Sequence, residues 1–562
     1  MSHRTQIIER IKDQPEPDVL IIGGGINGIG TFRDLALQKV SCLLVEQGDF
    51  CSGASMASSH MLHGGIRYLE NGEFRLVREA LHERSRLLRN APHLTHPLPT
   101  TIPIFKYFSG LFNAPLKFLG LLDRPAERGA VVIKLGLMVY DAYVRGDSPM
   151  PDHTFLNREQ ALEKWPHLNP DIQFAATYYD GAMPSPERLA LEILLDGIQE
   201  GEHARALNYL RAVDAEGERI TLEDQISGDT FSVQPQVVVN AGGPWIDFIN
   251  RDIDGETDFV GGTKGSHLIL DHPQLREAIG DHEFFFEYFD GRIVLIFPYR
   301  ERVLLGTTDI RIEHPDQARC TEEEIEYILG MVPRVFPDLE VSRKHIVFQF
   351  SGVRPLPPAE GVAGQISRDH AIQVVESGED LPWPILSLVG GKWTSYRAFS
   401  EQAADAVLNR LGKPRLASTR DVPIGGGRQY PGNEKLQQAW IEKVAAESGI
   451  HPHRAAQLFE RYGTRAEDFL AYLSRKEDRP LAHHPAYSVR EVQYLARQEM
   501  IAHLDDFILR RSLLAWLGEV NLPLLQELSH ILGGELGWSE GEIKQEIQRA
   551  QDVLAQDHGV ML

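Results

Sequence analysis

Four residues near the start of the chain have the types and the spacing needed to bind a dinucleotide. Gly23, Gly25 and Gly28 form the pattern G-x-G-x-x-G, and Glu46 follows 18 residues after the last of them. The first glycine permits a tight turn, the second lets backbone approach a pyrophosphate, and the third lets a helix pack closely. A carboxylate at Glu46 could accept hydrogen bonds from ribose hydroxyls and would repel a 2′-phosphate. An NADP-type ligand is therefore disfavoured.

The elements that must position these residues can be predicted from their surroundings. Residues 19–22 read Val-Leu-Ile-Ile, which is typical of a strand buried on both faces. A helix over residues 29–39 would direct its free N–H groups and its positive dipole end at the phosphates. A second apolar run, residues 42–45, leads directly into Glu46. Together these features predict a βαβ nucleotide-binding unit; the alternative is a glycine-rich turn between core elements.

Length and composition limit the class of protein. A chain of 562 residues is too long for one hydrophobic core, so two to four domains are expected. The net charge of −23 argues against a general affinity for nucleic acid, although a local basic pocket remains compatible with it. Three scattered cysteines predict neither a disulfide framework nor a cysteine metal site, and we expect a reducing compartment and no metal. No signal peptide or membrane-spanning run is expected.

Later segments predict a return to the nucleotide-binding sheet and a second sheet. Residues 237–240 and 385–389 are short apolar runs followed by small residues, Ala241 and Gly242 in the first case and Gly391 in the second. Residues 267–270, 293–297 and 303–306 predict an antiparallel sheet in a separate substrate domain. Helices are expected near residues 74–88, 187–197 and 394–411, and from residue 433 onward the pattern is helical.

Two segments have unusual composition. Residues 51–65 are rich in small and hydroxyl side chains, which suits a loop that wraps a cofactor. Residues 102–122 are dense in Phe, Leu and Ile, are interrupted by glycine and proline, and carry two lysines. The second segment cannot span a bilayer but suits a position along its surface. A buried hairpin or a dimer contact would satisfy the same apolar side chains.

Eight motifs in a fixed order resemble one family. The motifs GGGINGIG, HGGIRYLE, NAGGPW, KGSH, GTTD, SGVRP, SRD and GGKWT occur between about residues 18 and 397. This order resembles the FAD-dependent, membrane-associated glycerol-3-phosphate dehydrogenases, and RQEMIAHLDDFILRR at 497–511 resembles a characteristic helix of their C-terminal domain. The resemblance implies an α/β protein with a Rossmann-like FAD domain of the glutathione-reductase/D-amino-acid-oxidase type, an antiparallel-sheet substrate domain and a C-terminal all-α domain.

The resemblance also implies an organisation into domains. An N-terminal extension, 1–17, precedes an oxidoreductase region, 18–425, and a helical domain, 430–562. Within the oxidoreductase region the FAD-binding segments are expected at about 18–100, 190–250 and 350–412. The substrate-domain segments are expected at about 101–189 and 251–349.

The activity implied is oxidation of sn-glycerol 3-phosphate to dihydroxyacetone phosphate, with electrons passed from non-covalently bound FAD to membrane quinone. The family's substrate-pocket positions fall on Arg67, Tyr68, His267, Thr308, Arg354, Arg368 and Lys392. We expect FAD to contact Gly23, Gly25, Gly28, Glu46, Ser58, Ser59, Gly64, Ala241, Gly242, Gly391 and Lys392. Two departures stand out: His60 replaces a frequent lysine, and the apolar segment at 104–122 is longer than usual.

Chemistry suggests a role for several of these residues. Arginine forks suit a dianionic phosphate, although Arg368 beside Asp369 could instead form a structural ion pair. His267 suits a base for the substrate hydroxyl, while Arg354 could instead stabilise the alkoxide. Lys392 at a helix start offers a cation to the negative charge of a reduced flavin. His63 is expected near the flavin.

Several alternatives share parts of this pattern. A glycerol-3-phosphate oxidase would pass its electrons to oxygen. An amine or amino-acid oxidase would need one carboxylate-binding arginine rather than several. An inactive flavoprotein would not need Arg67, His267, Arg354 and Lys392. The expected location is the cytoplasm, at the inner face of the membrane, with residues 102–122 in contact with it. A homodimer is the competing use of that segment.

Overall fold

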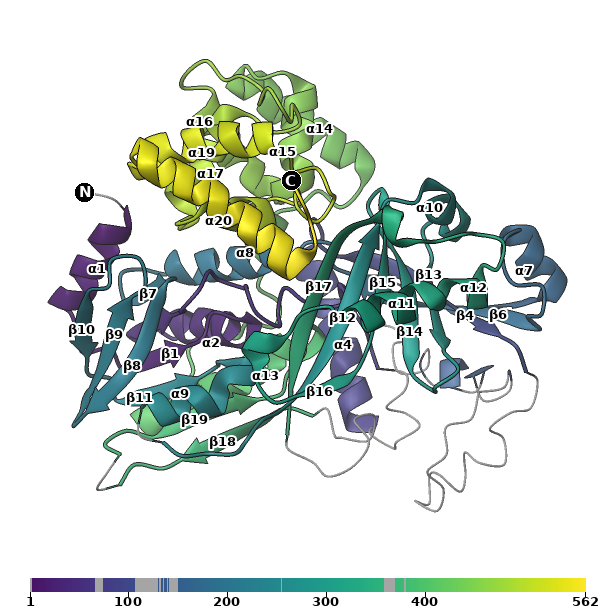
Figure 1. Ribbon diagram of the computed structural model, residues 1–562. Helices are drawn as coiled ribbons and strands as arrows, with labels where there is room; N and C mark the ends of the chain where they lie inside the picture. Colours follow the sequence, from purple (N-terminus) through teal and green to yellow (C-terminus); the bar gives the residue numbers. More distant parts are fainter. Residues whose placement is uncertain are drawn as a thin grey trace.

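The computed structural model describes residues 3–65, 74–106, 130, 133–134, 136–138, 140, 150–253, 255–357, 369–378 and 381–562. Two sheets stand side by side in Figure 1, and the C-terminal helices lie across one end of both. Among the described helices, none has the length and apolar character that a membrane crossing requires.

The first sheet is the nucleotide-binding sheet that the sequence predicts. Its strand order is β18-β19-β11-β1-β2-β7, with every pair parallel except β18 and β19. The strands are β1 (Val19–Ile22), β2 (Cys42–Val45), β7 (Ala204–Leu207), β11 (Val237–Asn240), β18 (Ala371–Val375) and β19 (Ile385–Val389).

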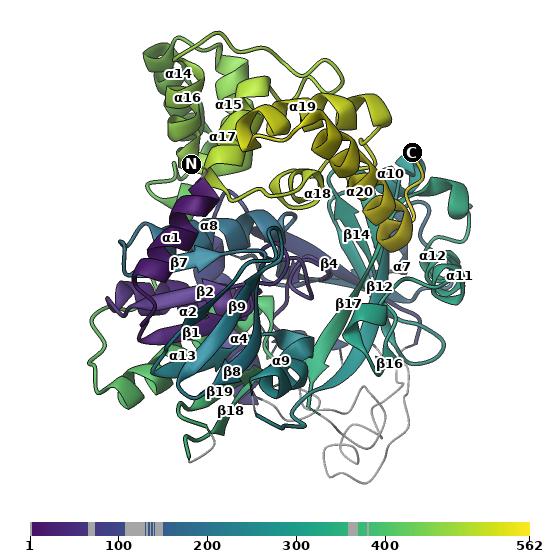
Figure 2. The ribbon, with the colours of Figure 1, turned by 60° about the vertical axis from the view of Figure 1, so that its left-hand side comes forward.

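Both faces of this sheet are covered, which explains why β1 is apolar at four consecutive positions. Val19 and Ile21 pack with the helices α2 (Ile26–Leu37), α8 (Pro186–Ile198) and α13 (Tyr396–Leu411). Leu20 and Ile22 pack on the other face with a small antiparallel sheet, β8 (Leu210–Glu216), β9 (Arg219–Asp224) and β10 (Thr230–Val233). Figure 2 shows β8 and β9 in front of β1 and β2. The N-terminal helix α1 (His3–Asp13) and α9 (Ile246–Asp252) adjoin the same unit.

The second sheet has ten strands and confirms the expected antiparallel pairing of the segments around 267, 293 and 303. Among the strands that the structure describes in this sheet, β4 and β13 form the one parallel pair. The strands are β3 (Met61–Leu62), β4 (His96–Ile104), β5 (Thr154–Asn157), β6 (Phe174–Ala182), β12 (Gly261–Leu270), β13 (Glu283–Glu287), β14 (Ile293–Tyr299), β15 (Arg302–Gly306), β16 (Ile310–Ile312) and β17 (Ile346–Leu356). The helices α4 (Phe74–Asn90), α7 (Arg158–Lys164), α10 (Pro273–Ile279), α11 (Glu322–Gly330) and α12 (Val332–Val335) accompany it.

The C-terminal part is helical, as expected: α14 (Glu434–Ser448), α15 (Pro452–Tyr462), α16 (Ala466–Leu473), α17 (Val489–Gln498), α18 (Leu504–Asp506), α19 (Leu522–Leu536) and α20 (Glu540–His558). Its apolar side chains share one hydrophobic cluster with Ile269, Phe297 and Phe348 of the second sheet. The helices therefore pack against the sheet as one core.

Two predicted helices have other bounds than expected. Residues 497–511 do not form one helix: α17 ends at Gln498, Met500 has φ +51°, and a π-helical turn covers Phe507–Arg511. A positive φ at a non-glycine residue cannot continue a right-handed helix. The helix after the glycine pattern begins at Ile26 rather than 29, because Gly25 already occupies its N-cap, and it ends at Leu37 before Lys39 at φ +59°.

Candidate active site

The glycine pattern forms a cradle in which backbone segments approach closely. A Cβ at Gly28 would lie 1.9 Å from the carbonyl oxygen of Gly23, and one at Gly23 would lie 2.6 Å from the carbonyl of Ala241. Gly23 also has φ +112°, a conformation that favours glycine. The turn after β1, the start of α2 and the turn after β11 therefore meet here. The Ile26 amide donates to the Ser55 hydroxyl at 2.9 Å, and the amides that follow it in the first turn of α2 are directed at the cradle.

Glu46 lies at the mouth of this cradle. Its carboxylate accepts hydrogen bonds from the amides of Gly24 at 2.7 Å and Gly48 at 2.8 Å, one to each oxygen. Burial raises the pKa of Glu46, and the two amides oppose that rise. Each oxygen retains a lone pair for a ribose hydroxyl. The cradle and this acid fit the dinucleotide that the sequence predicts.

The loop 51–65 is held against the cradle from several directions. The Cys51 amide donates to the Gly24 carbonyl at 2.9 Å, and the Trp393 indole N–H donates to the Ser55 carbonyl at 2.8 Å. The Gly64 amide donates to Asp180 at 3.0 Å. Sequence reasoning did not single out Ser55, Trp393 or Asp180. The tryptophan stands in the GGKWT motif, but nothing in the sequence marks Asp180 as an anchor.

The two serines predicted to contact the cofactor have different partners. Ser58 accepts the amide of His60 at 3.2 Å, a local turn contact. The hydroxyl of Ser59 lies 2.9 Å from Nε2 of His267. The loop thus connects the nucleotide cradle to the second sheet at Ser59.

His267 is buried near the end of β12, with its ring stacked on Phe350 at 4.8 Å between centroids. Gly306 on the paired strand leaves space for the ring, since a Cβ there would lie 2.1 Å from its Cδ2. Burial, and then the charge of Arg354, hold the pKa of His267 well below its usual range. Within the described residues Nδ1 has no hydrogen-bond partner. The ring is therefore neutral at neutral pH, so one of its two nitrogens carries a lone pair.

Arg354 lies on β17, which is paired antiparallel to β12 throughout its length. Its guanidinium lies over Gly265, where a Cβ would be 2.4 Å from Nη2, and is 3.3 Å from both Asp309 and Thr307. The Arg354 side chain is 28% exposed. Because side chains alternate along a strand, Gly265 and His267 share a face of β12, so Arg354 and His267 face the same space.

The hydroxyl of Thr308, a predicted substrate-pocket residue, is engaged by two other residues of the protein. Its hydroxyl donates to Glu324 at 2.6 Å and accepts the amide of Ser266 at 2.9 Å. The same carboxylate accepts from Lys264 at 2.7 Å and from the hydroxyl of Ser266 at 2.8 Å. Sequence reasoning missed Glu324, although the T-x-x-E spacing from Thr321 indicates the capping box that holds it. This buried network holds the turn at residues 307–309, which contacts Arg354.

The Gly391-Lys392 turn faces the start of α2. Gly391 has φ +96°, and a Cβ there would lie 2.6 Å from the side-chain amide of Asn27, which donates to the Gly390 carbonyl at 3.1 Å. Lys392 caps the short turn Trp393–Ser395 that leads into α13. Two helix starts and one lysine therefore meet beside the cradle. Gly242 stands at the neighbouring turn, where its amide donates to Asn240 at 3.0 Å.

Several predicted residues lie outside the described residues: Arg67, Tyr68, Arg368 and positions 107–122 of the apolar segment. Asp369, the alternative partner considered for Arg368, forms an ion pair with Arg75. The backbone carbonyl of His63 accepts a hydrogen bond from the hydroxyl of Thr394 at 3.2 Å.

His60 points into the interface with the C-terminal helices. It is fully buried, and its ring lies 5.1 Å from Trp516 and 5.2 Å from Tyr299 between centroids. Burial lowers the pKa of His60 to about 4. A neutral ring at this position suits an aromatic surrounding.

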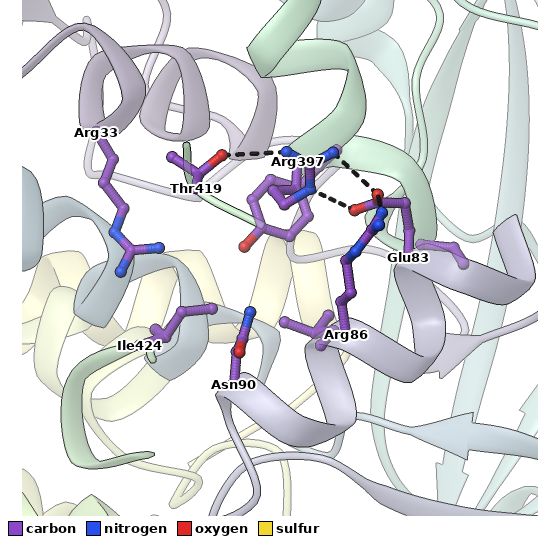
Figure 3. Close-up of a pocket in the computed structure, with 10 residues that line it drawn as sticks. Arg33, Glu83, Arg86, Asn90, Arg397, Thr419 and Ile424 are labelled. Carbon is purple, nitrogen blue, oxygen red and sulfur yellow. Dashed lines mark hydrogen bonds and ion pairs between the residues drawn. The ribbon is translucent and has the colours of Figure 1, made fainter. Parts of the chain in front are cut away.

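A small pocket lined by residues of α2, α4 and the start of α13 is not the substrate site (Figure 3). Its arginines already have carboxylate or hydroxyl partners: Arg397 binds Glu83 at 2.6 Å and Thr419 at 3.1 Å, and Arg33 binds Asp196 at 2.9 Å. The first of these pairs joins α13 to α4, and the Arg33–Asp196 pair joins α2 to α8.

Comparisons with known proteins agree with this geometry. Residues 18–396 match the FAD dependent oxidoreductase family, and residues 417–543 match the C-terminal domain of alpha-glycerophosphate oxidase. A glycerol-3-phosphate dehydrogenase from Synechocystis is 32% identical over 96% of both chains. The aerobic glycerol-3-phosphate dehydrogenase of Bacillus subtilis is 29% identical over 91% of this chain and 90% of its own. The structure of the Bacillus halodurans glycerol-3-phosphate dehydrogenase with FAD has a TM-score of 0.75 at 23% identity, covering 99% of this chain and 98% of its own.

Proposed function

Because the chain belongs to the FAD-dependent glycerol-3-phosphate dehydrogenase family, we propose that it oxidises sn-glycerol 3-phosphate to dihydroxyacetone phosphate and passes the electrons to membrane quinone. The observation that supports this most directly is the placement of His267 and Arg354. They lie on paired strands, face one space, and adjoin the loop that closes over the nucleotide cradle.

Each residue has a task that its surroundings support. FAD, when bound, supplies the acceptor for the hydride that leaves the secondary carbon of the substrate. His267, neutral at neutral pH, takes the hydroxyl proton. Arg354 directs its guanidinium to the substrate phosphate or to the alkoxide oxygen, and the Glu324 network holds the turn beside it. The remaining amides of the first turn of α2 would bind the pyrophosphate of FAD, and Glu46 would bind its ribose.

The first test removes the base. His267→Ala should keep FAD but slow anaerobic flavin reduction by glycerol 3-phosphate about 10²–10⁴-fold, the usual range for general base catalysis. His314→Ala, at a partly exposed histidine of the same domain, serves as the control and should reduce at the wild-type rate. An unchanged rate in the His267 variant would assign proton removal to another residue.

The second test keeps the positive charge at position 354 and removes the planar guanidinium group. Arg354→Lys should strongly lower kcat/KM for glycerol 3-phosphate, because lysine cannot form a planar bidentate contact. Arg343→Lys, at an exposed ion pair with Glu326, is the matched control. Equal turnover of glycerol and its phosphate by the wild type would exclude a phosphate pocket.

The electron acceptor needs its own test, because the family that matches the C-terminal domain takes its name from an alpha-glycerophosphate oxidase. With oxygen as the acceptor, substrate would drive stoichiometric hydrogen peroxide formation. With quinone as the acceptor, reduction of a soluble quinone should exceed oxygen uptake.

The expected membrane segment 102–122 is wrong at its start, because residues 102–104 belong to β4 and Ile104 is buried in the core. Membrane attachment through the later part of the segment is proposed from its composition. Replacing Phe108, Phe112 and Phe118 with Ser should release the protein from vesicles while dye-linked activity survives. If the triple variant stays bound to vesicles, the segment belongs to the core or to a subunit contact.

A further inference from the structure

The C-terminal helices contact the loop that carries Glu46. Asp49, three residues further along this loop, is buried at 1% exposure. Arg511 donates from Nη2 to its Oδ1 at 2.9 Å, and the other oxygen accepts from both Arg510 and Arg511. Both arginines stand in the π-helical turn Phe507–Arg511 of the C-terminal domain. One buried carboxylate is thus held by two guanidinium groups from a segment more than 450 residues away.

A second set of contacts joins the same two regions. The side-chain amide of Asn208 donates to Asp49 and to the Met500 carbonyl, both at 2.9 Å. The neighbouring Tyr209 donates its hydroxyl to Asp506 at 2.6 Å. Asp506 also accepts from Arg510 at 2.7 Å. The turn after β7 therefore bridges the loop and the C-terminal domain.

Gly48 links these contacts to the Glu46 carboxylate. The Gly48 amide donates to Glu46 at 2.8 Å, and the Gly48 carbonyl accepts the amide of Tyr209 at 2.9 Å. Gly48 is directly bonded to Asp49, so moving Asp49 moves the amide that orients Glu46. Position and charge act together here, since the charge of Asp49 raises the pKa of Glu46 and that of Arg510 lowers it.

We infer that the C-terminal domain holds the ribose-binding loop in place through Arg510, Arg511 and Asp49, so that docking of this domain and FAD binding are coupled. The three residues are positioning residues that act through Gly48 and Glu46. The inference rests on the proposed contact between Glu46 and the FAD ribose. Coupling of this kind is reciprocal: whatever weakens the docking weakens FAD binding, and FAD in turn stabilises the docked domain.

A matched pair of variants tests the inference. Asp49→Asn removes the charge that both arginines bind. His558→Ala weakens another buried contact of the C-terminal helices, where the His558 ring lies 4.3 Å from that of Phe348 on β17 and its Nδ1 lies 3.0 Å from the Gln349 carbonyl. FAD dissociation is measured by flavin fluorescence as each full-length holoenzyme is diluted.

The Kd for FAD should rise about tenfold or more in Asp49→Asn and stay near the wild-type value in His558→Ala, while both variants lower Tm. A wild-type Kd in Asp49→Asn, or an equal rise in both variants, would overturn the inference. These titrations need no substrate. Loss of flavin reduction by glycerol 3-phosphate in the wild type would instead count against the proposed function.

A second measurement does not depend on the variants folding. Hydrogen exchange of the wild-type chain is compared at limiting and at saturating FAD. Saturation should slow exchange at residues 504–511 but not in α14, which packs against α15 and α16 within the same domain. Equal protection of the two segments, or none at 504–511, would contradict the coupling.

Discussion

Glu187 is a buried acid whose replacement should stabilise the protein in a pH-dependent way. It stands in the first turn of α8 with 2% exposure, and its Oε1 has no hydrogen-bond partner among the described residues. Burial raises the pKa of Glu187 from 4.5 to about 8, although its own backbone amide, Arg510 and Arg188 oppose the rise. The folded protein therefore keeps this carboxyl group protonated at neutral pH.

The sign and size of the effect follow from proton linkage. The pKa of Glu187 is higher in the folded than in the unfolded protein, so proton binding by Glu187 favours the folded state. This contribution to the free energy of unfolding is complete below pH 4.5 and is lost as pH rises through about 8. Each pH unit in this window costs about 1.4 kcal/mol, which makes about 3 kcal/mol at pH 7 an upper limit. Glu187→Gln keeps the shape of the protonated acid and removes the titration. The variant should gain little at pH 5 and most at pH 8.

The assay is thermal unfolding of both holoenzymes between pH 5 and 8. The difference in Tm between Glu187→Gln and wild type should widen steadily as the pH rises. Glu159→Gln is the matched control, because Glu159 is the second residue of α7 as Glu187 is of α8 but is exposed. Parallel curves for Glu187→Gln and wild type would show that Glu187 is ionised in the folded protein and would refute the reasoning.

Two further predictions follow from the same structure. Gly28→Ala should lose FAD on purification, because its Cβ would lie 1.9 Å from the Gly23 oxygen, whereas Gly432→Ala, with open space around it, should keep FAD; retention in both would contradict the close approach. The wild type should also lose unfolding free energy as pH falls from 6.5 towards 4, because His60 and His558 have pKa values of about 4 when folded and bind protons more readily when unfolded. His60→Gln should reduce this loss by up to about 3 kcal/mol in denaturant titrations, and an unchanged pH slope would exclude His60.

Sequence patterning predicted the local elements well where burial imposes a period. Four apolar residues in β1 indicated a strand covered on both faces, and the structure places helices on one face and a small sheet on the other. The helix bounds were less accurate, since Gly25 acts as an N-cap and Lys39 leaves the helical conformation. The expected helix at 497–511 was wrong, because Met500 interrupts it at a positive φ and the residues beyond form a π turn. Helical spacing of apolar residues does not reveal such a break.

The chemistry of the site was predicted in part. The glycine cradle and Glu46 are local in sequence, so their spacing alone indicated a nucleotide site. His267 and Arg354 are 87 positions apart in sequence, and only the pairing of β12 with β17 places them on one face. Thr308, expected in the substrate pocket, has both hydrogen-bonding functions engaged by Glu324 and Ser266. Its family motif did not reveal that engagement.

The sequence by itself determined the nucleotide unit, because a βαβ element encodes its glycines, helix start and acid within about 30 consecutive residues. It also carried the ordered motifs from which the family resemblance follows. Only the tertiary structure decided how the C-terminal domain meets the cofactor loop. Asp49 and Arg511 are ordinary charged residues in the sequence, and only their shared burial makes each depend on the other. Contacts between distant segments leave no period or spacing in the chain, so they become visible when the chain is folded.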